Sequence, residues 1–558
     1  MRILFSVLAV AVLSFGCKKE PGPVSTPPPA EKPKPAGPCI AVSIAYGSEK
    51  KAWLDEQAKL FVQSGPKLAS GRCVTVDLKA MGSGEVTLGI LNGSLQPTVY
   101  SPASSAYLSL LNSAWVQKSG RAEPLAPPGN ALVLSPIVIA MWKPMAESLG
   151  WPAKNLSWKD LIKVAQNAKG WAAYGHPEWG QFKFGHTQPE YSNSGLLAVL
   201  AVAYAGKGEV RGLTVKDLEL PAVLKAIEEV EKPIVHYGKS TGFFADKMVA
   251  RGPGYLSAAV LYESSIIESY SKSPALPLVA IYPSEGTFWS DHPYSVLDAP
   301  WNTAEHKEAA NALLAFLKSK SAQERAMALG FRPSDPAIAL GAPIDEAHGV
   351  DPKQPQTLLE IPEAATLEKL LQVWARHKKP TDVVLVFDKS GSMDGKPMRE
   401  AKVGGLAFID QLKDADELSI IVFDSVVAAP AGPFKLATQR EEAKALINAL
   451  FASGGTALYD ATLKGYELSL ERAKKEPNKI HAVVVMTDGA DANSKLPLAN
   501  LRTGLNAEER KSRVFTIAYG PDPDIKILEG IAESGQGTAA KGTEANIVQV
   551  FQDIGAFF

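Results

Sequence analysis

One carboxylate and two hydroxyls recur at every second residue in the segment Asp388-Lys-Ser390-Gly-Ser392. The apolar run at residues 383–387 precedes it, and such a run is typical of a strand buried on both faces in a parallel sheet. Ligands of open α/β sheets bind beyond the carboxyl ends of the strands, where an extended loop would point the three oxygens the same way. Hard oxygen donors suit Mg²⁺ or Mn²⁺, but three are too few to saturate either ion.

Two later segments offer further oxygen donors for the same sheet edge. Thr456 follows two glycines at the start of an expected helix over residues 457–474, and Asp488 follows a second apolar run at residues 483–486. An Asp-x-Ser-x-Ser segment alone is more commonly a turn or a helix N-cap. Because Thr456 and Asp488 offer further oxygen donors at the same edge, we interpret the segment as part of a metal site instead. A P-loop is excluded because Lys396 is followed by Pro397 instead of Ser or Thr.

These donors resemble the metal-ion-dependent adhesion site of the von Willebrand factor A domain, which is D-x-S-x-S followed by a distant Thr and a distant Asp. The resemblance covers roughly residues 379–558. It implies a doubly wound, Rossmann-like α/β domain that binds Mg²⁺ or Mn²⁺, with a carboxylate from a protein partner completing the coordination. The alternative is an A-type fold whose site no longer holds metal. The implied ligands are Asp388, Ser390, Ser392, Thr456 and Asp488.

Length and charge limit the classes of protein that this chain can represent. With 558 residues and a hydrophobic content of 46%, the chain can bury more than one core, and two long domains fit best. The 58 Lys and Arg residues nearly balance the 59 Asp and Glu residues. This balance argues against nucleic acid and against an anionic membrane surface as partners.

The first 38 residues have the features of an export signal followed by a tether. Residues 1–16 combine Arg2 with an apolar run that is too short to span a bilayer. The segment ending in Cys17 resembles the bacterial lipoprotein cleavage box, which implies a lipidated Cys17 and an exported protein anchored to the membrane, in the periplasm or at the cell surface. The alternative is an ordinary secreted protein with a stray cysteine. The tether, residues 17–38, contains eight prolines, so we expect it to be extended.

Cys39 and Cys73 each directly precede a strand-like run. If the two runs are neighbouring parallel strands, their starts lie side by side and a disulfide fits the geometry. Export makes this bond chemically plausible. Two buried free thiols are the alternative.

From residue 39 strands and helices alternate, which indicates a parallel sheet. The segment Gly82-Ser83-Gly84 opens an expected helix, and the amides at a helix start suit an anion. The order of this segment and of five later ones resembles that in type II periplasmic solute-binding proteins, above all those for molybdate, sulfate and phosphate. The later segments are residues 101–105, 135–141, 187–195, 262–263 and 282–287. The resemblance implies a bilobal α/β domain over residues 39–350. It places the chain crossings between lobes near residues 135–136 and 277–282.

The same resemblance implies a solute site between the lobes. Hydroxyls and helix starts that face each other across a cleft can bind a dehydrated oxyanion without a full countercharge. The alternative is that the serines only cap helices, and that the domain binds another solute or none. The implied ligand-binding residues are Ser83, Gly84, Ser101 and Ser104 of one lobe, and Ser194, Gly195 and Tyr262 of the other.

We expect a binding protein and not an enzyme, because no serine has His and Asp in a recognisable nucleophile context. In the first hypothesis a surface-anchored lipoprotein binds a protein partner through the metal of residues 379–558, while residues 39–350 bind a small solute. In the alternative the chain is the solute receptor of an ABC-type importer, and the A domain is an accessory dock. A connecting helix within residues 351–378 is expected to hold the two domains in one relative geometry; a free linker is the alternative.

Overall fold

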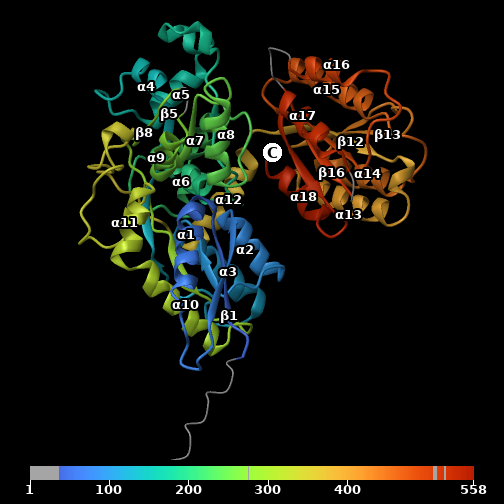
Figure 1. The fold of residues 1–558 in the computed structure, drawn as a ribbon. Coiled ribbons are helices and arrows are strands. Elements are labelled where there is room, and N and C mark those ends of the chain that lie inside the picture. The colour runs from blue at the N-terminus through green and yellow to red at the C-terminus, as the bar shows by residue number, and fades with distance from the viewer. Residues whose placement is uncertain (1–36, 274–275, 507–511, 521–522) are drawn as a thin grey trace, which may run out of the picture.

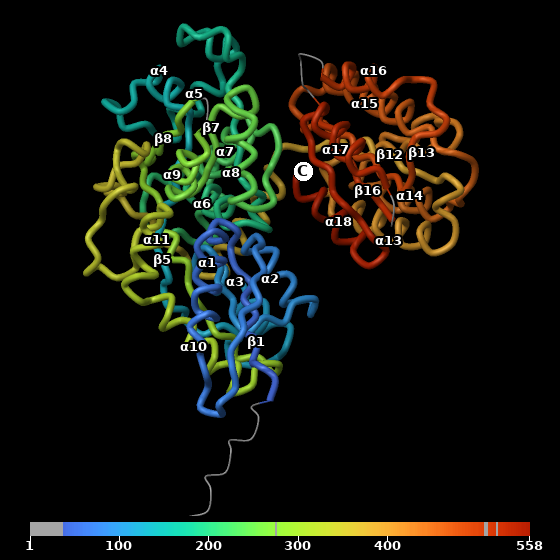
Figure 2. Tube along the Cα trace, in the orientation of Figure 1, coloured from blue at the N-terminus to red at the C-terminus, as the bar shows by residue number. Residues whose placement is uncertain are grey.

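The computed structural model describes residues 37–273, 276–506, 512–520 and 523–558. Two parts follow one another along the chain and lie side by side, an N-terminal domain up to residue 377 and a C-terminal domain from residue 378 (Figure 1). The tube in Figure 2 shows the same arrangement, with the C-terminal domain in orange and red. The expected signal, Cys17 and most of the tether lie outside the described residues. Within the described part of the chain, no helix has both the length and the apolar composition needed to cross a bilayer.

The first lobe of the N-terminal domain is built on a five-stranded sheet of order β2-β1-β3-β10-β4. Strands β1, β2 and β3 are parallel, as the alternation of strands and helices predicts, and β10 is antiparallel to both of its neighbours. Its elements are β1 (Ile40–Gly47), α1 (Lys51–Gln63), β2 (Val74–Met81), α2 (Ser83–Asn92), β3 (Val99–Ser101), α3 (Ser105–Ser119), β4 (Asn130–Ala131), β10 (Pro293–Val296), α10 (Ala304–Leu317) and α11 (Lys320–Ala328).

The second lobe is built around the long strand β5, which is buried along most of its length. Its sheet has the order β11-β5-β7-β6, and β8 and β9 also pair with β5. The elements are β5 (Val133–Trp142), α4 (Lys143–Ser148), α5 (Trp158–Gln166), β6 (Phe184–Gly185), α6 (Asn193–Lys207), α7 (Pro221–Glu231), α8 (Thr241–Arg251), β7 (Ala258–Tyr262), α9 (Glu263–Ser271), β8 (Leu278–Ile281), β9 (Trp289–Ser290) and β11 (Arg332–Pro333).

The chain passes between the lobes at positions that differ in part from the prediction. It leaves the first lobe between β4 and β5, close to the predicted crossing at residues 135–136. The return occurs between β9 and β10, about ten residues after the predicted one. The reason is that β8 pairs antiparallel with β5 and keeps the chain in the second lobe. A third passage, which was not predicted, brings β11 back to β5.

The C-terminal domain has a six-stranded sheet of order β14-β13-β12-β15-β16-β17. The sheet is parallel except for the edge strand β14. Its elements are β12 (Thr381–Asp388), α13 (Lys396–Gln411), β13 (Glu417–Phe423), β14 (Ala431–Lys435), α14 (Leu436–Asn448), α15 (Leu458–Lys475), β15 (Ile480–Thr487), α16 (Leu498–Leu505), β16 (Ser512–Tyr519), α17 (Ile525–Ser534), β17 (Gln536–Gly542) and α18 (Ile547–Gly555).

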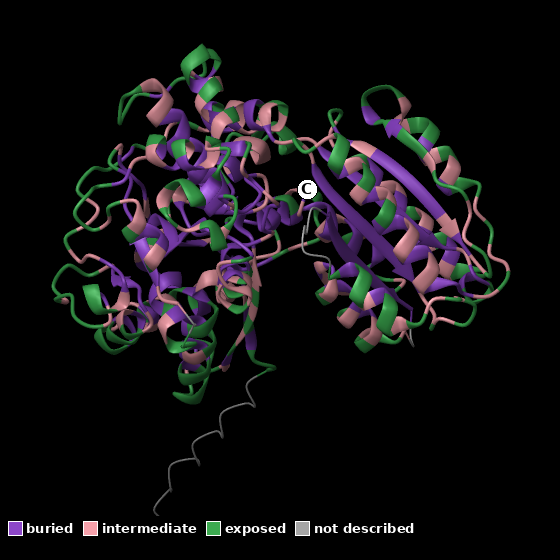
Figure 3. Cartoon of the chain, turned by 90° about the horizontal axis from the view of Figure 1, so that it is seen from above, coloured by how far each residue is buried: buried purple, intermediate pink, exposed green. Residues whose placement is uncertain are grey.

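Both faces of this sheet are covered, which confirms the doubly wound fold. Val384 and Val386 pack on one face with residues of α15, α16 and α17. Val383, Leu385 and Phe387 pack on the other face with residues of α13, α14 and α18. Figure 3 shows the buried strands between helices whose outer surfaces are exposed. Because every second residue points to the opposite face, an unbroken apolar run is what such a strand needs.

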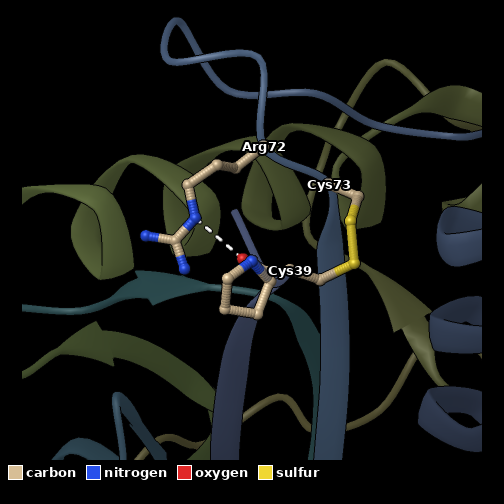
Figure 4. The surroundings of a disulfide bond; sticks show 4 residues. Cys39, Arg72 and Cys73 are labelled. Carbon is tan, nitrogen blue, oxygen red and sulfur yellow. Dashed lines mark hydrogen bonds between the residues drawn. A yellow bond between two sulfur atoms is a disulfide. The ribbon is translucent and has the colours of Figure 1, made fainter. Parts of the chain in front are cut away.

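The predicted disulfide joins the starts of β1 and β2. Cys39 and Cys73 are bonded, and their Cα atoms lie 4.5 Å apart. The two strands are parallel neighbours, and the register pairs Ile40 with Val74 directly after the cysteines. Arg72 donates a hydrogen bond of 2.8 Å to the carbonyl of Pro38 beside the bond (Figure 4).

The connecting segment contains α12 (Ala364–His377), which packs against α3, α6 and α7 of the N-terminal domain. Trp374 is fully buried and donates a hydrogen bond of 2.9 Å to Glu231. Directly after the helix, the Lys378 ammonium donates to Asp416 and to the carbonyl of Phe558, both at 3.3 Å. The segment is therefore an ordered part of the N-terminal domain and leads directly into the C-terminal one.

Candidate functional site

The first candidate site lies at the carboxyl edge of the C-terminal sheet, where two adjacent parallel strands end. Asp388 is the last residue of β12, and Asp488 directly follows the last residue of β15. The register pairs Phe387 with Met486, so the two strands end at the same level. Two hydroxyls lie at this edge close to Gly489. A Cβ atom added to Gly489 would lie 3.6 Å from the Thr456 hydroxyl and 3.7 Å from the Ser392 hydroxyl.

Hydrogen bonds join four of the five predicted metal ligands. The backbone amide of Ser390 donates to Asp388 over 2.7 Å. The hydroxyls of Ser390 and Ser392 lie 3.1 Å apart, and Ser392 donates to Asp488 over 2.7 Å. Thr456, the fifth, is held at the start of α15, where its amide donates to Asn493 over 2.9 Å. The structure thus gathers segments that lie about a hundred residues apart in sequence.

The pKa values of the two carboxyl groups are both raised above their ordinary value. Burial raises the pKa of Asp388 to about 6, although hydrogen bonds from Thr487 and Ser390 act in the opposite direction. Burial also raises the pKa of Asp488, against the lowering effect of the Ser392 hydrogen bond. Two adjacent carboxyls in a partly desolvated edge favour a bound cation, since a cation offsets both burial and mutual repulsion.

The donor set fits Mg²⁺ or Mn²⁺. Two carboxylates and three hydroxyls are hard oxygen ligands, and Mg²⁺ is usually bound through one or two carboxylates together with water. Among the described residues, no group of three or more His, Cys, Asp or Glu side chains is arranged to hold a metal. A metal at this edge would therefore depend on Ser390, Ser392 and Thr456 as much as on the two acids.

The predicted solute-binding residues lie where the two lobes of the N-terminal domain meet. Ser104 donates to the Asn193 side chain over 2.6 Å, and Asn193 in turn donates to the Tyr262 hydroxyl over 3.0 Å. Ser83 accepts a hydrogen bond of 3.0 Å from the amide of Ala103. All the predicted serines and Tyr262 are buried. The structure therefore brings residues of the two lobes together, as the resemblance implies.

The helix starts that were predicted to hold an anion already have protein partners. At the start of α2, the Gly84 amide donates to the carbonyl of Tyr191 over 2.9 Å. At the start of α6, the Gly195 amide donates to the Thr187 hydroxyl over 2.8 Å, and Ser194 also lies 2.8 Å from that hydroxyl. In this arrangement the lobes are closed on each other. A solute that uses these amides must displace their present partners.

One predicted residue retains an unused hydrogen-bonding group. The Ser101 hydroxyl is fully buried at the end of β3 and has no partner among the described residues. A buried polar group of this kind is costly unless water or a ligand satisfies it. The Ser101 hydroxyl therefore keeps a hydrogen-bonding capacity that no described residue uses.

A buried ionic cluster beside Ser101 was not predicted. Lys50 donates to Glu49 over 3.0 Å, to His292 over 3.2 Å and to the carbonyl of Pro102 over 3.3 Å. Burial would raise the pKa of Glu49, but Lys50 and His292 outweigh it and lower the pKa to about 2. In the sequence, the only sign of this cluster was that Glu49 and Lys50 directly follow an apolar strand. Nothing in the sequence connects Lys50 to His292, which lies 242 residues away.

A second unpredicted residue supports the metal edge. Thr487 ends β15, and its hydroxyl donates to Asp388. The hydroxyl therefore fixes one oxygen of Asp388, while the Ser390 amide fixes the other. In the sequence, only the position of Thr487 between an apolar run and Asp488 pointed to this supporting role.

Comparison with known families agrees with both domains. The family model for bacterial extracellular solute-binding proteins matches residues 42–332. The model for the von Willebrand factor type A domain matches residues 382–553. The two matches cover most of the described chain and fall on the two domains of the structure.

Individual relatives are similar over limited regions. An uncharacterized protein of Synechocystis, sll0103, is 33% identical over 162 residues, which are 29% of this chain and 37% of that protein. Inter-alpha-trypsin inhibitor heavy chain H4 of Bos taurus is 29% identical over 173 residues, 29% of this chain and 18% of that protein. The chain thus spans well under half the length of either relative.

Among solved structures, the sulfate-binding protein SubI of Mycobacterium tuberculosis is 18% identical, with a TM-score of 0.37, and the match covers 53% of this chain and 88% of that one. A von Willebrand factor type A protein of Catenulispora acidiphila is 24% identical, with a TM-score of 0.29, and the match covers 32% of this chain and 42% of that one.

Proposed function

Since the chain belongs to the bacterial extracellular solute-binding proteins and also carries a von Willebrand factor type A domain, we propose that it is an exported binding protein with two separate ligands. The A domain would capture a protein partner through Mg²⁺ or Mn²⁺. The N-terminal domain would bind a small solute between its lobes.

One observation carries the proposal for the A domain: hydrogen bonds link Asp388, Ser390, Ser392 and Asp488 in one chain at the edge of the sheet. Thr456 borders the same cluster. When bound, the metal supplies a positive charge with a coordination position for an outside ligand, and the carboxylate of a partner is a hard anionic ligand for it. Ser392 is exposed, so this edge is open to a partner.

For the N-terminal domain we propose a small solute, with oxyanions as the class to test first. The unpartnered hydroxyl of Ser101 and the helix starts at Gly84 and Gly195 support this choice. Ser83, Ser104, Ser194 and Tyr262 would complete the site. Binding would require the lobes to separate and close again, because Tyr191 of the second lobe engages the Gly84 amide of the first lobe. Within the second lobe, Thr187 would have to release the Gly195 amide.

We also propose that Cys17 anchors the protein to a membrane through a lipid. The sequence around Cys17 and the proline-rich segment after it support this proposal. The segment would separate the folded domains from the membrane surface.

Calorimetric titration of the exported chain with Mg²⁺ tests the metal site. We expect one bound ion in the parent and none in Asp388→Ala, while circular dichroism shows an unchanged fold because Asp388 lies at the edge of the sheet. Asp394→Ala is the matched control, since Asp394 is an exposed carboxylate at the end of the same loop and outside the cluster. Mg²⁺ binding that survives Asp388→Ala would refute the proposed site.

A further inference from the structure

A pocket of about 550 Å³ lies between the second lobe and the C-terminal domain. Phe182 and Tyr255 line it from the second lobe, and Ile480 and Gln536 line it from the C-terminal domain. It lies away from the metal edge, because Ile480 begins β15 whereas Asp488 follows the end of that strand. It is also separate from the solute cleft, with which it shares no residue.

The charges that line this pocket are almost all positive. A single carboxylate, that of Glu229, faces five cationic side chains. Lys479 forms ion pairs with Glu417 and Glu476 of its own domain. The five are Lys183, Lys232, Lys379, Lys479 and Arg513.

Two more cations extend this positive cluster beside Tyr255. The guanidinium carbon of Arg513 lies 4.9 Å from the centre of the Tyr255 ring, and that of Arg251 lies 5.5 Å from the same centre. Arg251 donates to the carbonyl of Gly537 over 2.9 Å. Lys247, one helical turn before Arg251, lies over the Phe557 ring. Residues of both domains thus bring three cations together.

No carboxylate among the described residues lies within ion-pairing distance of Lys247, Arg251, Lys379 or Arg513. Burial and the two guanidinium groups of Arg251 and Arg513 lower the pKa of Lys247 to about 7. Burial lowers the pKa of Lys379 to about 8. Cations that are desolvated and repel one another destabilise the folded chain unless an anion compensates them.

We propose that this pocket binds a small polyanion that carries two or more phosphate, sulfate or carboxylate groups. Arg513 offers a planar guanidinium that matches such groups, and the lysines offer point charges around it. The volume suits a small molecule. Because the cations come from both domains, the bound anion would also strengthen the contact between them.

The test titrates the exported chain with pyrophosphate and, separately, with citrate. Metal is removed by resin, because a soluble chelator is itself a polyanion. At low ionic strength we expect one bound anion per chain and no binding of acetate. The dissociation constant should rise about tenfold or more in Arg513→Gln, since a charge-assisted hydrogen bond is lost.

Lys232→Gln keeps the test valid if Arg513→Gln fails to fold, because Lys232 is exposed and its substitution leaves the core unchanged. It should weaken binding as well. The matched control is Lys159→Gln, an exposed lysine of α5 that does not line the pocket. Absence of binding by both probes, or equal affinity in parent, Arg513→Gln and Lys232→Gln, would overturn the proposal. Loss of binding in Ser83→Ala with Ser194→Ala would instead place the anion in the cleft.

Discussion

The main-chain carbonyl of Tyr191, in the second lobe, accepts a hydrogen bond from the amide of Gly84, in the first lobe. The hydroxyl of the same tyrosine accepts a hydrogen bond of 2.8 Å from Gln411 of the C-terminal domain. Lys239 makes a parallel connection, because its ammonium lies 2.8 Å from Glu85 and 2.7 Å from Asp553. The closed cleft and the contact between the domains therefore share residues.

Gly84→Ala should open the cleft. An added Cβ atom would lie 2.0 Å from the carbonyl oxygen of Glu190, so the two lobes could not keep their present contact. We expect the free energy of unfolding to fall by about 1–3 kcal/mol, and small-angle scattering to show a larger radius of gyration. The control is Gly341→Ala, because no atom lies within 4 Å of a Cβ atom there. Identical scattering from parent and Gly84→Ala would show that the contact does not hold the lobes closed.

The sequence predicted those parts of the site that lie at strand ends. An apolar run fixes a buried parallel strand, and the residue after it must lie at the ligand-binding edge, so Asp388 and Asp488 could be placed without the structure. The pairing of Cys39 with Cys73 followed from the same reasoning, because two strand starts were expected to be neighbours.

Contacts between residues far apart in sequence could not be predicted. Nothing in the sequence near Tyr191 indicates that its carbonyl accepts a hydrogen bond from the Gly84 amide. That amide was expected to bind the solute instead. The third passage between the lobes was missed because β11 has two residues, too few for a periodic pattern. His292 was missed because its partners, Glu49 and Lys50, lie far from it in sequence, with 242 positions between Lys50 and His292.

Replacing Cys39 and Cys73 by alanine should destabilise the first lobe by about 3–5 kcal/mol on the chain-entropy model for a loop of this length. The bond closes a segment with a sequence separation of 34. Thermal unfolding of parent and double variant measures the effect. Thiol labelling of the denatured, unreduced protein should detect neither cysteine, and stoichiometric labelling of both would contradict the bond.

Cys17→Ser should release the protein from membranes into the extracytoplasmic fraction. The expectation comes from the cleavage-box resemblance, since Cys17 lies outside the described residues. Cell fractionation followed by immunoblotting measures the distribution. A variant that remains wholly with the membranes would show that another feature anchors the chain.

The pH dependence of stability should reveal Lys247. Its pKa is lowered to about 7, chiefly by burial, so between pH 7 and the ordinary lysine value the unfolded chain holds a proton that the folded chain has lost. Stability contributed by this group therefore rises with pH across that window and falls as pH decreases toward 7. Lys247→Met should be most stabilising, relative to the parent, at pH 7 and below, and the difference should shrink by pH 9.5.

Denaturant unfolding of both proteins at several pH values measures this difference. Lys225→Met, at an exposed lysine, is the control and should show no such trend. A Lys247→Met effect that is constant with pH would mean that Lys247 does not titrate in this range.

Thr487→Val should weaken Mg²⁺ binding although Thr487 is not expected to touch the ion. Its hydroxyl donates to Asp388, and removing it frees one oxygen of that carboxylate to rotate away from the cluster. Loss of such an outer partner weakens metal affinity by about 10–100-fold. Calorimetric titration with Mg²⁺ measures the change. Valine keeps the shape and β-propensity of the buried position, so the fold should persist.

Thr516→Val is the matched control for this substitution. Thr516 is a buried threonine on the adjacent strand β16, and its hydroxyl donates to the carbonyl of Leu528, away from the metal edge. It should lower stability by the loss of one hydrogen bond, about 1 kcal/mol, and leave the Mg²⁺ affinity unchanged. If both variants reduce the affinity equally, the effect comes from general destabilisation of the sheet. If Thr487→Val binds Mg²⁺ as tightly as the parent, the orientation of Asp388 does not depend on Thr487.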